Sequence, residues 1–397
     1  MIPLRARSVE FSEAGATADI CVVRIAVHAD RPAPLKASEA LVVQSGTVPP
    51  GFGWYIVGND ADLSCVPNVA RVVVAPEQAS YLGQGDVVAI DPKRKAIRVL
   101  HRQGVGYNHF LLTERCNNYC LMCSQPPRDV DDTWVADEVL EALPLISRDA
   151  GEICFTGGEP TLLGPKFLEL VQAASAYLPR TALHILSNGR AFAQGEIAAR
   201  LGDIDHHDLM VGIPVYSDLA HVHDHVVQAD GAFDETIRGI LALKASGVRV
   251  EVRVVLQAQT VDRLPDLARF ICRNLLFVDH VALMALEPTG FARANLNSIW
   301  ADPIDYAPQL TEAVRVLSGA GLRTSIYNSQ LCVLPRSLWP LARKSISDWK
   351  NAFLPECEGC EAKPMCSGFF ESAKYAKSRG IGPITLMEAK TLLPTRA

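Results

Sequence analysis

The sequence lacks the features of a membrane or secreted protein. No uninterrupted apolar run reaches about 18 residues, the length that a membrane-spanning helix requires. Residues 1–8 contain no apolar core of a signal peptide. We therefore expect a cytoplasmic protein that makes no membrane contact.

An excess of positive charge is also missing. The formal net charge is −6, whereas surfaces that bind nucleic acids or anionic membranes are rich in Lys and Arg. We therefore expect no nucleic-acid partner. With 397 residues, of which 49% are hydrophobic and 21% charged, the composition is that of a globular protein with room for two or three domains.

Cysteine, by contrast, is abundant, with 11 residues in the chain. Disulfides are not expected without a secretory signal, so this number points to metal binding or redox chemistry. Four cysteines lie in apolar or loop contexts and are interpreted as core or incidental residues: Cys21, Cys65, Cys154 and Cys272. The other seven form two groups.

The pattern of apolar runs and turns in residues 1–105 is typical of a small β-rich domain. Apolar runs at 20–27 and 71–75 predict strands, and 86–90 with 96–100 predict a hairpin around a turn at 91–95. Such a domain could bind a peptide substrate or simply cap its neighbour, because a fold alone assigns no function.

From residue 106 to about 300, predicted strands and helices alternate. We expect strands at 110–113, 152–155, 182–186, 209–215, 248–256 and 280–286. We expect helices at 136–146, 165–177, 196–201, 233–245 and 264–275. This alternation predicts an α/β domain with a parallel sheet, helices outside it and the active site at the carboxyl ends of the strands.

The first cysteine group follows the first of these strands. Cys116, Cys120 and Cys123 have the spacing C-x3-C-x2-C. Three thiolates can hold three corners of a [4Fe–4S] cluster and leave one iron open for a ligand. A structural zinc site would normally require a fourth ligand, which this loop does not offer.

Further candidate residues follow the later strands. Gly157 and Gly158 allow close approach of a ligand to the backbone, and Glu159 offers a carboxylate to a cation. Asn188 is either a ligand contact or part of an Asx turn. Arg253 faces the polar side of its strand, where it either pairs with Glu251 or reaches an anionic ligand.

The second cysteine group lies near the C-terminus. Cys332, Cys357, Cys360 and Cys366 stand in irregular sequence that contains prolines. Four thiolates complete the ligand set of a second iron–sulfur cluster, but they suit zinc equally well. Residue type alone does not choose between the two.

The C-x3-C-x2-C loop followed by Gly157-Gly158-Glu159-Pro160 resembles the radical S-adenosylmethionine (radical SAM) superfamily. This resemblance implies a partial (β/α)6 barrel in which the open iron binds SAM. It further implies that residues 157–159 bind the SAM amino group. For Arg253 the pairing with Glu251 and a contact with the SAM carboxylate both remain open. Met122 stands where the family often has an aromatic residue.

The C-terminal cysteines resemble the auxiliary-cluster domains called SPASM and Twitch, and their number implies the Twitch-like form with one [4Fe–4S] cluster at residues 301–397. Residues 100–370 are also similar to radical SAM maturases of the His-Xaa-Ser system, most distinctively at residues 122–127. This similarity implies a peptide or small-protein substrate with His-Xaa-Ser repeats, an external electron donor and a second radical SAM maturase as a possible partner. No acid or base residue is assigned. The alternatives are a radical SAM enzyme for a small molecule or nucleotide, and a non-catalytic metal-binding scaffold.

Overall fold

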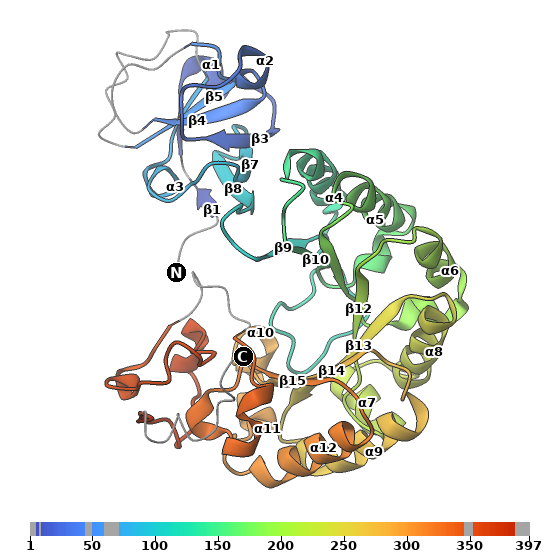
Figure 1. Cartoon of the computed structure of the whole chain (residues 1–397). Coiled ribbons are helices and arrows are strands. Elements are labelled where there is room, and N and C mark those ends of the chain that lie inside the picture. Colours follow the sequence, from blue (N-terminus) through green and yellow to red (C-terminus); the bar gives the residue numbers. More distant parts are fainter. Residues whose placement is uncertain (1–4, 8, 44–49, 59–70, 345–351, 386–397) are drawn as a thin grey trace, which may run out of the picture.

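A computed structural model describes residues 5–7, 9–43, 50–58, 71–344 and 352–385. It contains two sheets, which form separate units in Figure 1. Among the described residues, none of the helices combines the length and apolar character needed to cross a bilayer. Cys65, interpreted from sequence as a core or incidental residue, lies outside the described residues.

The N-terminal sheet has eight strands in the order β1-β8-β7-β3-β4-β5-β6-β2. The strands are β1 (Arg5–Arg7), β2 (Glu10–Phe11), β3 (Cys21–Ala26), β4 (Glu39–Val43), β5 (Trp54–Val57), β6 (Val72–Val74), β7 (Val87–Asp91) and β8 (Ala96–His101). Three short helices accompany them: α1 (Glu13–Ala16), α2 (Ala33–Lys36) and α3 (Pro76–Ala79). The hairpin that the sequence predicts is present as the antiparallel pair β7–β8.

The second sheet is parallel throughout, in the order β15-β14-β13-β12-β11-β10-β9. Its strands are β9 (Tyr107–Leu111), β10 (Glu152–Thr156), β11 (Ala182–Leu186), β12 (Leu209–Pro214), β13 (Arg249–Leu256), β14 (His280–Ala285) and β15 (Thr324–Tyr327). The expected six-stranded barrel is therefore extended by β15. This strand pairs with β14, although its sequence lies within the expected C-terminal region.

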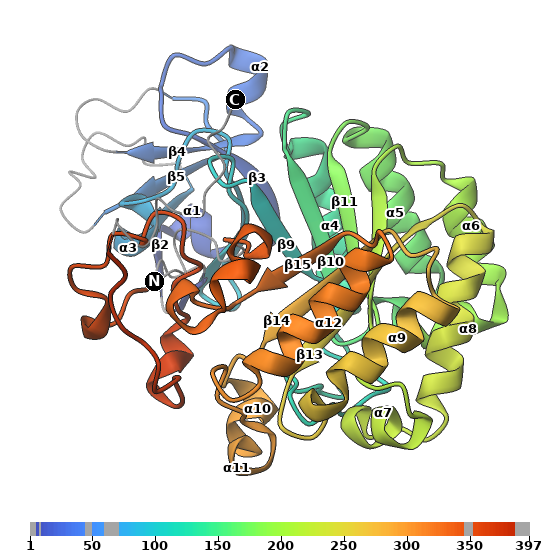
Figure 2. The same cartoon turned by 60° about the horizontal axis from the view of Figure 1, so that its bottom comes forward.

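Helices cover the convex side of this curved sheet, as Figures 1 and 2 show. They are α4 (Thr133–Ala142), α5 (Pro165–Tyr177), α6 (Glu196–Asp203), α8 (Ala232–Ala245), α9 (Leu264–Asn274) and α12 (Ala307–Gly319). The main hydrophobic core lies between helices and sheet. On β13 the valines 250, 252 and 254 belong to this core, which leaves Glu251 and Arg253 on the concave face.

Three further helices lie near the carboxyl ends of the strands: α7 (Ala220–Val227), α10 (Gly290–Ala294) and α11 (Leu296–Ile299). Beyond β15 the chain is mostly irregular, with 3-10 turns at Leu331–Val333, Arg336–Leu341, Pro355–Cys357 and Glu371–Lys374. Prolines at 335, 340, 355, 364 and 383 interrupt this region, and a proline in a helix interior removes a backbone hydrogen bond.

The two sheets meet at the β7–β8 hairpin and α4. The Trp134 ring of α4 lies under two guanidinium groups of the hairpin, Arg94 at 4.4 Å and Arg98 at 4.8 Å from its centroid. Arg98 also donates a hydrogen bond to the Glu138 carboxylate on the same helix. Cation–π and ionic contacts therefore link the N-terminal sheet to the barrel.

Candidate functional site

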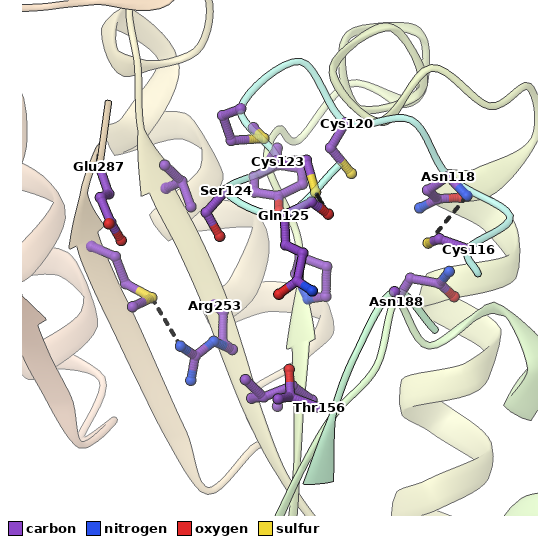
Figure 3. Close-up of a pocket in the computed structure, with 18 of the residues that line it drawn as sticks. Cys116, Asn118, Cys120, Cys123, Ser124, Gln125, Thr156, Asn188, Arg253 and Glu287 are labelled. Atoms are coloured by element: carbon purple, nitrogen blue, oxygen red, sulfur yellow. Dashed lines mark hydrogen bonds between the residues drawn. The ribbon is translucent and has the colours of Figure 1, made fainter. Parts of the chain in front are cut away.

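A cavity of about 300 Å³ lies at the carboxyl ends of the parallel strands. Most of the residues that the sequence singles out line it: Cys116, Cys120, Cys123, Gly157, Gly158, Asn188 and Arg253. Figure 3 shows Cys116 beside Asn188, Cys120 and Cys123 across the same space, and Arg253 on the opposite wall. Residues far apart in sequence therefore converge on one site.

The three-cysteine loop is held by neighbouring helices. Backbone amides of Tyr119 and Leu121 donate to carbonyl oxygens of Val227 (3.0 Å) and Val226 (2.9 Å) at the end of α7. The Asn295 side chain donates to the Leu121 carbonyl at 2.9 Å. These bonds satisfy the loop backbone and leave the thiol side chains facing the cavity.

No cysteine of this loop is in a disulfide within the described residues. Burial raises the pKa of Cys116 to about 11, and it also raises the pKa of Cys120 and Cys123. Buried thiols remain protonated unless a cation is nearby, and a metal centre provides one. Three convergent, unpaired thiols of this kind fit a cluster with an open corner.

Among the described residues, no three His, Cys, Asp or Glu side chains lie close enough together to bind a single metal ion. A single ion draws its ligands around one point, whereas each thiolate of a cubane binds a different corner. The thiolate ligands of a [4Fe–4S] cluster are therefore spaced more widely than the ligands of a zinc ion.

Gly157 and Gly158 press against the start of the cysteine loop. A Cβ atom on Gly157 would lie 2.6 Å from the Thr113 carbonyl oxygen, and one on Gly158 would collide with the Arg115 carbonyl. The Gly158 amide donates to the Thr113 oxygen at 2.7 Å. Only glycine permits this approach of the two loops.

Glu159 is placed differently from its neighbours. Its side chain is buried, and it is not among the described residues that line the cavity. The carboxylate accepts hydrogen bonds from Thr161 Oγ1 (2.7 Å), Ser187 Oγ (2.8 Å) and the Asn188 amide (2.6 Å). Burial raises its pKa, while these donors oppose the rise. Glu159 thus connects the loops after β10 and β11.

Asn188 connects the loop after β11 to the cysteine loop. Its Nδ2 donates to Asn117 Oδ1 at 2.6 Å, and its side chain also hydrogen-bonds to Cys116, which favours the thiolate. Arg190 was not expected from sequence, yet its Nη1 donates to the Asn117 carbonyl and to Asn118 Oδ1, both at 2.8 Å. Together these two side chains fix the position of the first cysteine.

Arg253 both pairs with Glu251 and lines the cavity, so the two sequence alternatives are compatible. Its Nη1 donates to Glu251 Oε1 at 2.6 Å, and its Nη2 donates to the Met284 sulfur at 3.1 Å. A thioether is a weak acceptor, so an anionic ligand would be a better partner. Gly212 leaves room for the side chain, since a Cβ there would lie 2.9 Å from Arg253 Cδ.

Glu251 is the charged partner of a small polar group beneath the cavity. Burial alone would raise its pKa, but a hydrogen bond from His280 and the charge of Arg253 together lower it to about 2. The Nδ1 atom of His280 lies 2.6 Å from Glu251 Oε2. An ionised Glu251 therefore holds the guanidinium of Arg253 in place.

Other residues that line the cavity were given no individual role from the sequence. They include Gln125, Tyr216, Glu287 and Asn328, together with Met122. Met122 and Tyr216 are also buried in one hydrophobic cluster with the end of α7. They contribute an apolar wall to the site.

Three histidines, His221, His223 and His225, lie on the helix α7. His223 is buried, accepts a hydrogen bond from the Tyr216 amide at 3.2 Å and stacks on the Tyr216 ring. Alternation of histidine with apolar residues hides the helical pattern, because the face that packs is only two turns long.

The C-terminal cysteines lie near one another. Burial raises the pKa of Cys332, and Cys366 and Cys357 are close enough to raise it further. Burial likewise raises the pKa of Cys357, with added effects of Cys366 and Cys360. The structure therefore brings all four residues of the second group to one region.

The remaining described cysteines, Cys21, Cys154 and Cys272, are free thiols in or beside the hydrophobic clusters.

Comparison with known proteins gives one match to a family model, described as the Radical SAM superfamily, over residues 110–271. A curated relative, the AdoMet-dependent heme synthase of Oleidesulfovibrio alaskensis, is 26% identical over 187 residues, which is 46% of this chain and 45% of that protein. The pre-heme d1 synthase of Dinoroseobacter shibae is 28% identical over 161 residues, 40% of this chain and 38% of that protein. The chain thus spans less than half the length of these relatives.

Solved structures with partial similarity include SuiB of Streptococcus suis bound to S-adenosylmethionine, with a TM-score of 0.46 and 15% identity over 56% of this chain and 50% of that chain. Native anSMEcpe with bound AdoMet has a TM-score of 0.48 and 14% identity over 72% of this chain and 94% of that chain.

The family match begins in β9 and ends in α9. It includes the cysteine loop, the paired glycines and Arg253, which are the residues that converge on the cavity. Residues 110–271 therefore match the radical SAM superfamily at the residues that form the site.

Proposed function

We propose that this chain is a radical SAM enzyme that reductively cleaves S-adenosylmethionine and modifies a peptide or small protein. The observation that carries the proposal is one cavity in which three unpaired cysteines, a glycine backbone and an arginine converge. When bound, the cluster and SAM would supply an electron and a 5′-deoxyadenosyl radical.

The residues around the cavity have separate roles in this proposal. Cys116, Cys120 and Cys123 would hold the [4Fe–4S] cluster, and the backbone at Gly157 and Gly158 would face the amino group of SAM. Arg253 would bind the carboxylate of SAM, since its guanidinium already faces the cavity with only a thioether on one nitrogen. These contacts would orient the cofactor and exclude water from it.

Two further residues would act by positioning. Glu159 joins the loops after β10 and β11, and Asn188 hydrogen-bonds the loop that carries Cys116. The wall formed by Met122 and Tyr216 would shield the cofactor from solvent. No acid or base is assigned.

For the rest of the chain we propose a small β domain at residues 1–105, the partial barrel at 106–300 and a Twitch-like region at 301–397. Cys332, Cys357, Cys360 and Cys366 would hold a second [4Fe–4S] cluster. The proximity of these four thiols supports a shared metal centre.

The substrate that we propose is a peptide with His-Xaa-Ser repeats, with an external electron donor and a second radical SAM maturase as partners. Support comes from the similarity of residues 122–127 and of the cysteine tail to maturases of that system. The second candidate is a radical SAM enzyme that acts on a small molecule, because the curated relatives are named heme and pre-heme synthases.

The first experiment measures iron, sulfide and zinc after anaerobic preparation, in the native protein and in a Cys116/Cys120/Cys123→Ala variant. About eight irons in the native protein and about four in the variant would support two cubane clusters. Zinc alone would overturn the radical mechanism.

The second experiment measures 5′-deoxyadenosine after anaerobic reduction with SAM. The native protein should form it and the triple variant should not. A His-Xaa-Ser repeat peptide that increases its formation and gains a modification would support the peptide assignment. An increase with a tetrapyrrole and none with the peptide would favour the small-molecule candidate.

A further inference from the structure

Residues 378–384 form a segment that we call the C-terminal strap. One end is fixed to the loop before α12: the Arg379 amide donates to Asp302 at 3.0 Å, and its guanidinium donates to Asp305 at 2.9 Å. Ser378 Oγ also hydrogen-bonds to Asp302. The strap thus starts from a charged anchor on the barrel side of the molecule.

From this anchor the strap packs against the loop that carries Cys332. A Cβ atom on Gly380 would lie 2.8 Å from Ile304 Cγ2 and 3.5 Å from Val333 Cγ1. Val333 directly follows Cys332 in the chain. A residue larger than glycine would force the strap away from the cysteine turn.

The strap then donates backbone hydrogen bonds to two cysteines of the second group. The Ile384 amide donates to Cys360 Sγ at 3.4 Å, and the Gly382 amide donates to Cys332. In return, the Glu361 amide donates to the Ile384 carbonyl at 2.9 Å, which fixes the register of the strap beside Cys360. Pro383, between the two donors, has no N–H to give.

Amide donors to cysteine sulfur withdraw negative charge from a metal thiolate. Hydrogen bonds to the sulfurs and solvent exposure are two of the levers that set the reduction potential of an iron–sulfur cluster. Donors stabilise the more negative, reduced cluster, so they raise its potential.

We propose that the C-terminal strap raises the reduction potential of the second cluster through the amides of Gly382 and Ile384. In this arrangement Arg379, Asp302 and Asp305 are positioning residues, because they fix the strap without touching the cysteines. The inference rests on the second cluster of the proposed function. It extends that function, since a higher potential makes the cluster a better electron acceptor.

The test uses the Cys116/Cys120/Cys123→Ala background, in which only the second cluster remains. Ile384→Pro removes the amide donor and the isoleucine side chain. Ile384→Ala also removes most of that side chain but keeps the amide. An EPR-monitored redox titration is run on both. At the potential at which the cluster of the triple variant is half reduced, we expect several-fold less reduced cluster after Ile384→Pro. After Ile384→Ala we expect nearly the same reduced fraction as in the triple variant. Equal curves at equal iron content would overturn the proposal.

Arg379→Gln provides a second route, in case Ile384→Pro fails to load iron. It should loosen the strap and lower the potential in the same direction. Lys377→Gln is the matched control, because it removes the same charge one residue before the strap, where Lys377 pairs with Glu356. Similar shifts in both variants would mean that charge alone acts, and would overturn the role of the anchor.

Metal analysis separates this inference from the proposed function. Zinc in place of iron in the triple-variant background would overturn the strap proposal. SAM cleavage by the native protein would remain intact in that case. Loss of SAM cleavage with a second cluster of normal potential would instead contradict the proposed function alone.

Discussion

At the scale of single residues, the site depends on backbone contacts that only small side chains allow. Gly158 lies so close to the cysteine loop that an added Cβ would collide with the Arg115 carbonyl and lie 3.0 Å from Cys116 Cβ. The clash with Arg115 involves backbone atoms, which cannot rotate away as a side chain can.

We therefore predict that Gly158→Ala displaces the cysteine loop. Overpacking of this kind costs about 1–3 kcal/mol, and iron bound by the first cluster should fall markedly. Gly104→Ala is the control, because a Cβ there meets no heavy atom of the described residues within 4 Å. Iron content and thermal unfolding are measured for both. Equal iron in the two variants would contradict this account of Gly158.

Arg253 supports a prediction about cofactor binding. Arg253→Gln removes a charge-assisted contact worth about 1.5–3 kcal/mol, so SAM affinity should fall by about ten- to a hundredfold. The iron content should stay at the native value. Arg249→Gln on the same strand removes an arginine that pairs with Asp208 at the opposite end, and should leave affinity unchanged. Equilibrium dialysis with labelled SAM distinguishes the two.

At the scale of elements, the sequence predicted most of the barrel. Predicted strands and helices such as Ala182–Leu186 and Pro165–Tyr177 agree with the structure, because alternating or helical apolar patterns record which face is buried. The strand β15 belongs to the barrel sheet, although it lies within residues 301–397, which the sequence assigns to the C-terminal region. Three helices, α10, α11 and α12, separate it from its partner β14, and no local pattern reveals such pairing.

The candidate site likewise has one part that the sequence predicts and one part that it does not. Cysteine spacing and the paired glycines are local signals, and the structure places both at the cavity. The contacts of Arg190 and Glu159 span long stretches of sequence: Arg190 reaches Asn117, and Glu159 reaches Ser187. Which donors surround a polar side chain depends on tertiary packing, so sequence alone did not reveal the inward direction of Glu159.

The strand β8 supports a prediction about acid stability. Burial lowers the pKa of His101 to about 4, and neither ring nitrogen has a hydrogen-bond partner among the described residues. The unfolded chain binds a proton near pH 6.5, whereas the folded chain binds it only near pH 4. The contribution of His101 to stability is therefore full above about pH 6.5 and falls as the pH decreases toward 4.

His101→Leu should remove this part of the pH dependence. Denaturant midpoints at pH 7.5 and pH 5 are compared for the native protein, His101→Leu and His207→Leu. His207 is exposed on the turn before β12 and serves as the control. The native protein and the control should lose more stability at pH 5 than His101→Leu does. An equal loss in all three would show that His101 does not remain neutral in the folded state.

At the scale of the whole molecule, one aromatic side chain stands at the contact between the barrel and the N-terminal sheet. Trp134 of α4 lies beneath both Arg94 and Arg98 of the β7–β8 hairpin, and Arg98 also binds Glu138. Each partly exposed cation–π pair contributes about 0.5–1 kcal/mol. Removal of this ring should therefore weaken the attachment of the N-terminal unit more than the stability of the barrel.

Trp134→Ala tests this arrangement by hydrogen exchange. Amides of β7 and β8 should exchange faster than in the native protein, because opening of the interface exposes them, while amides of β11 and β12 keep their protection. Tyr177→Ala, at the end of α5, removes an exposed ring that lies away from the hairpin and is the control. SAM cleavage without substrate should be unchanged in Trp134→Ala. If its stimulation by peptide is lost while the barrel stays protected, the N-terminal unit takes part in substrate binding; retained stimulation means that it only caps the barrel.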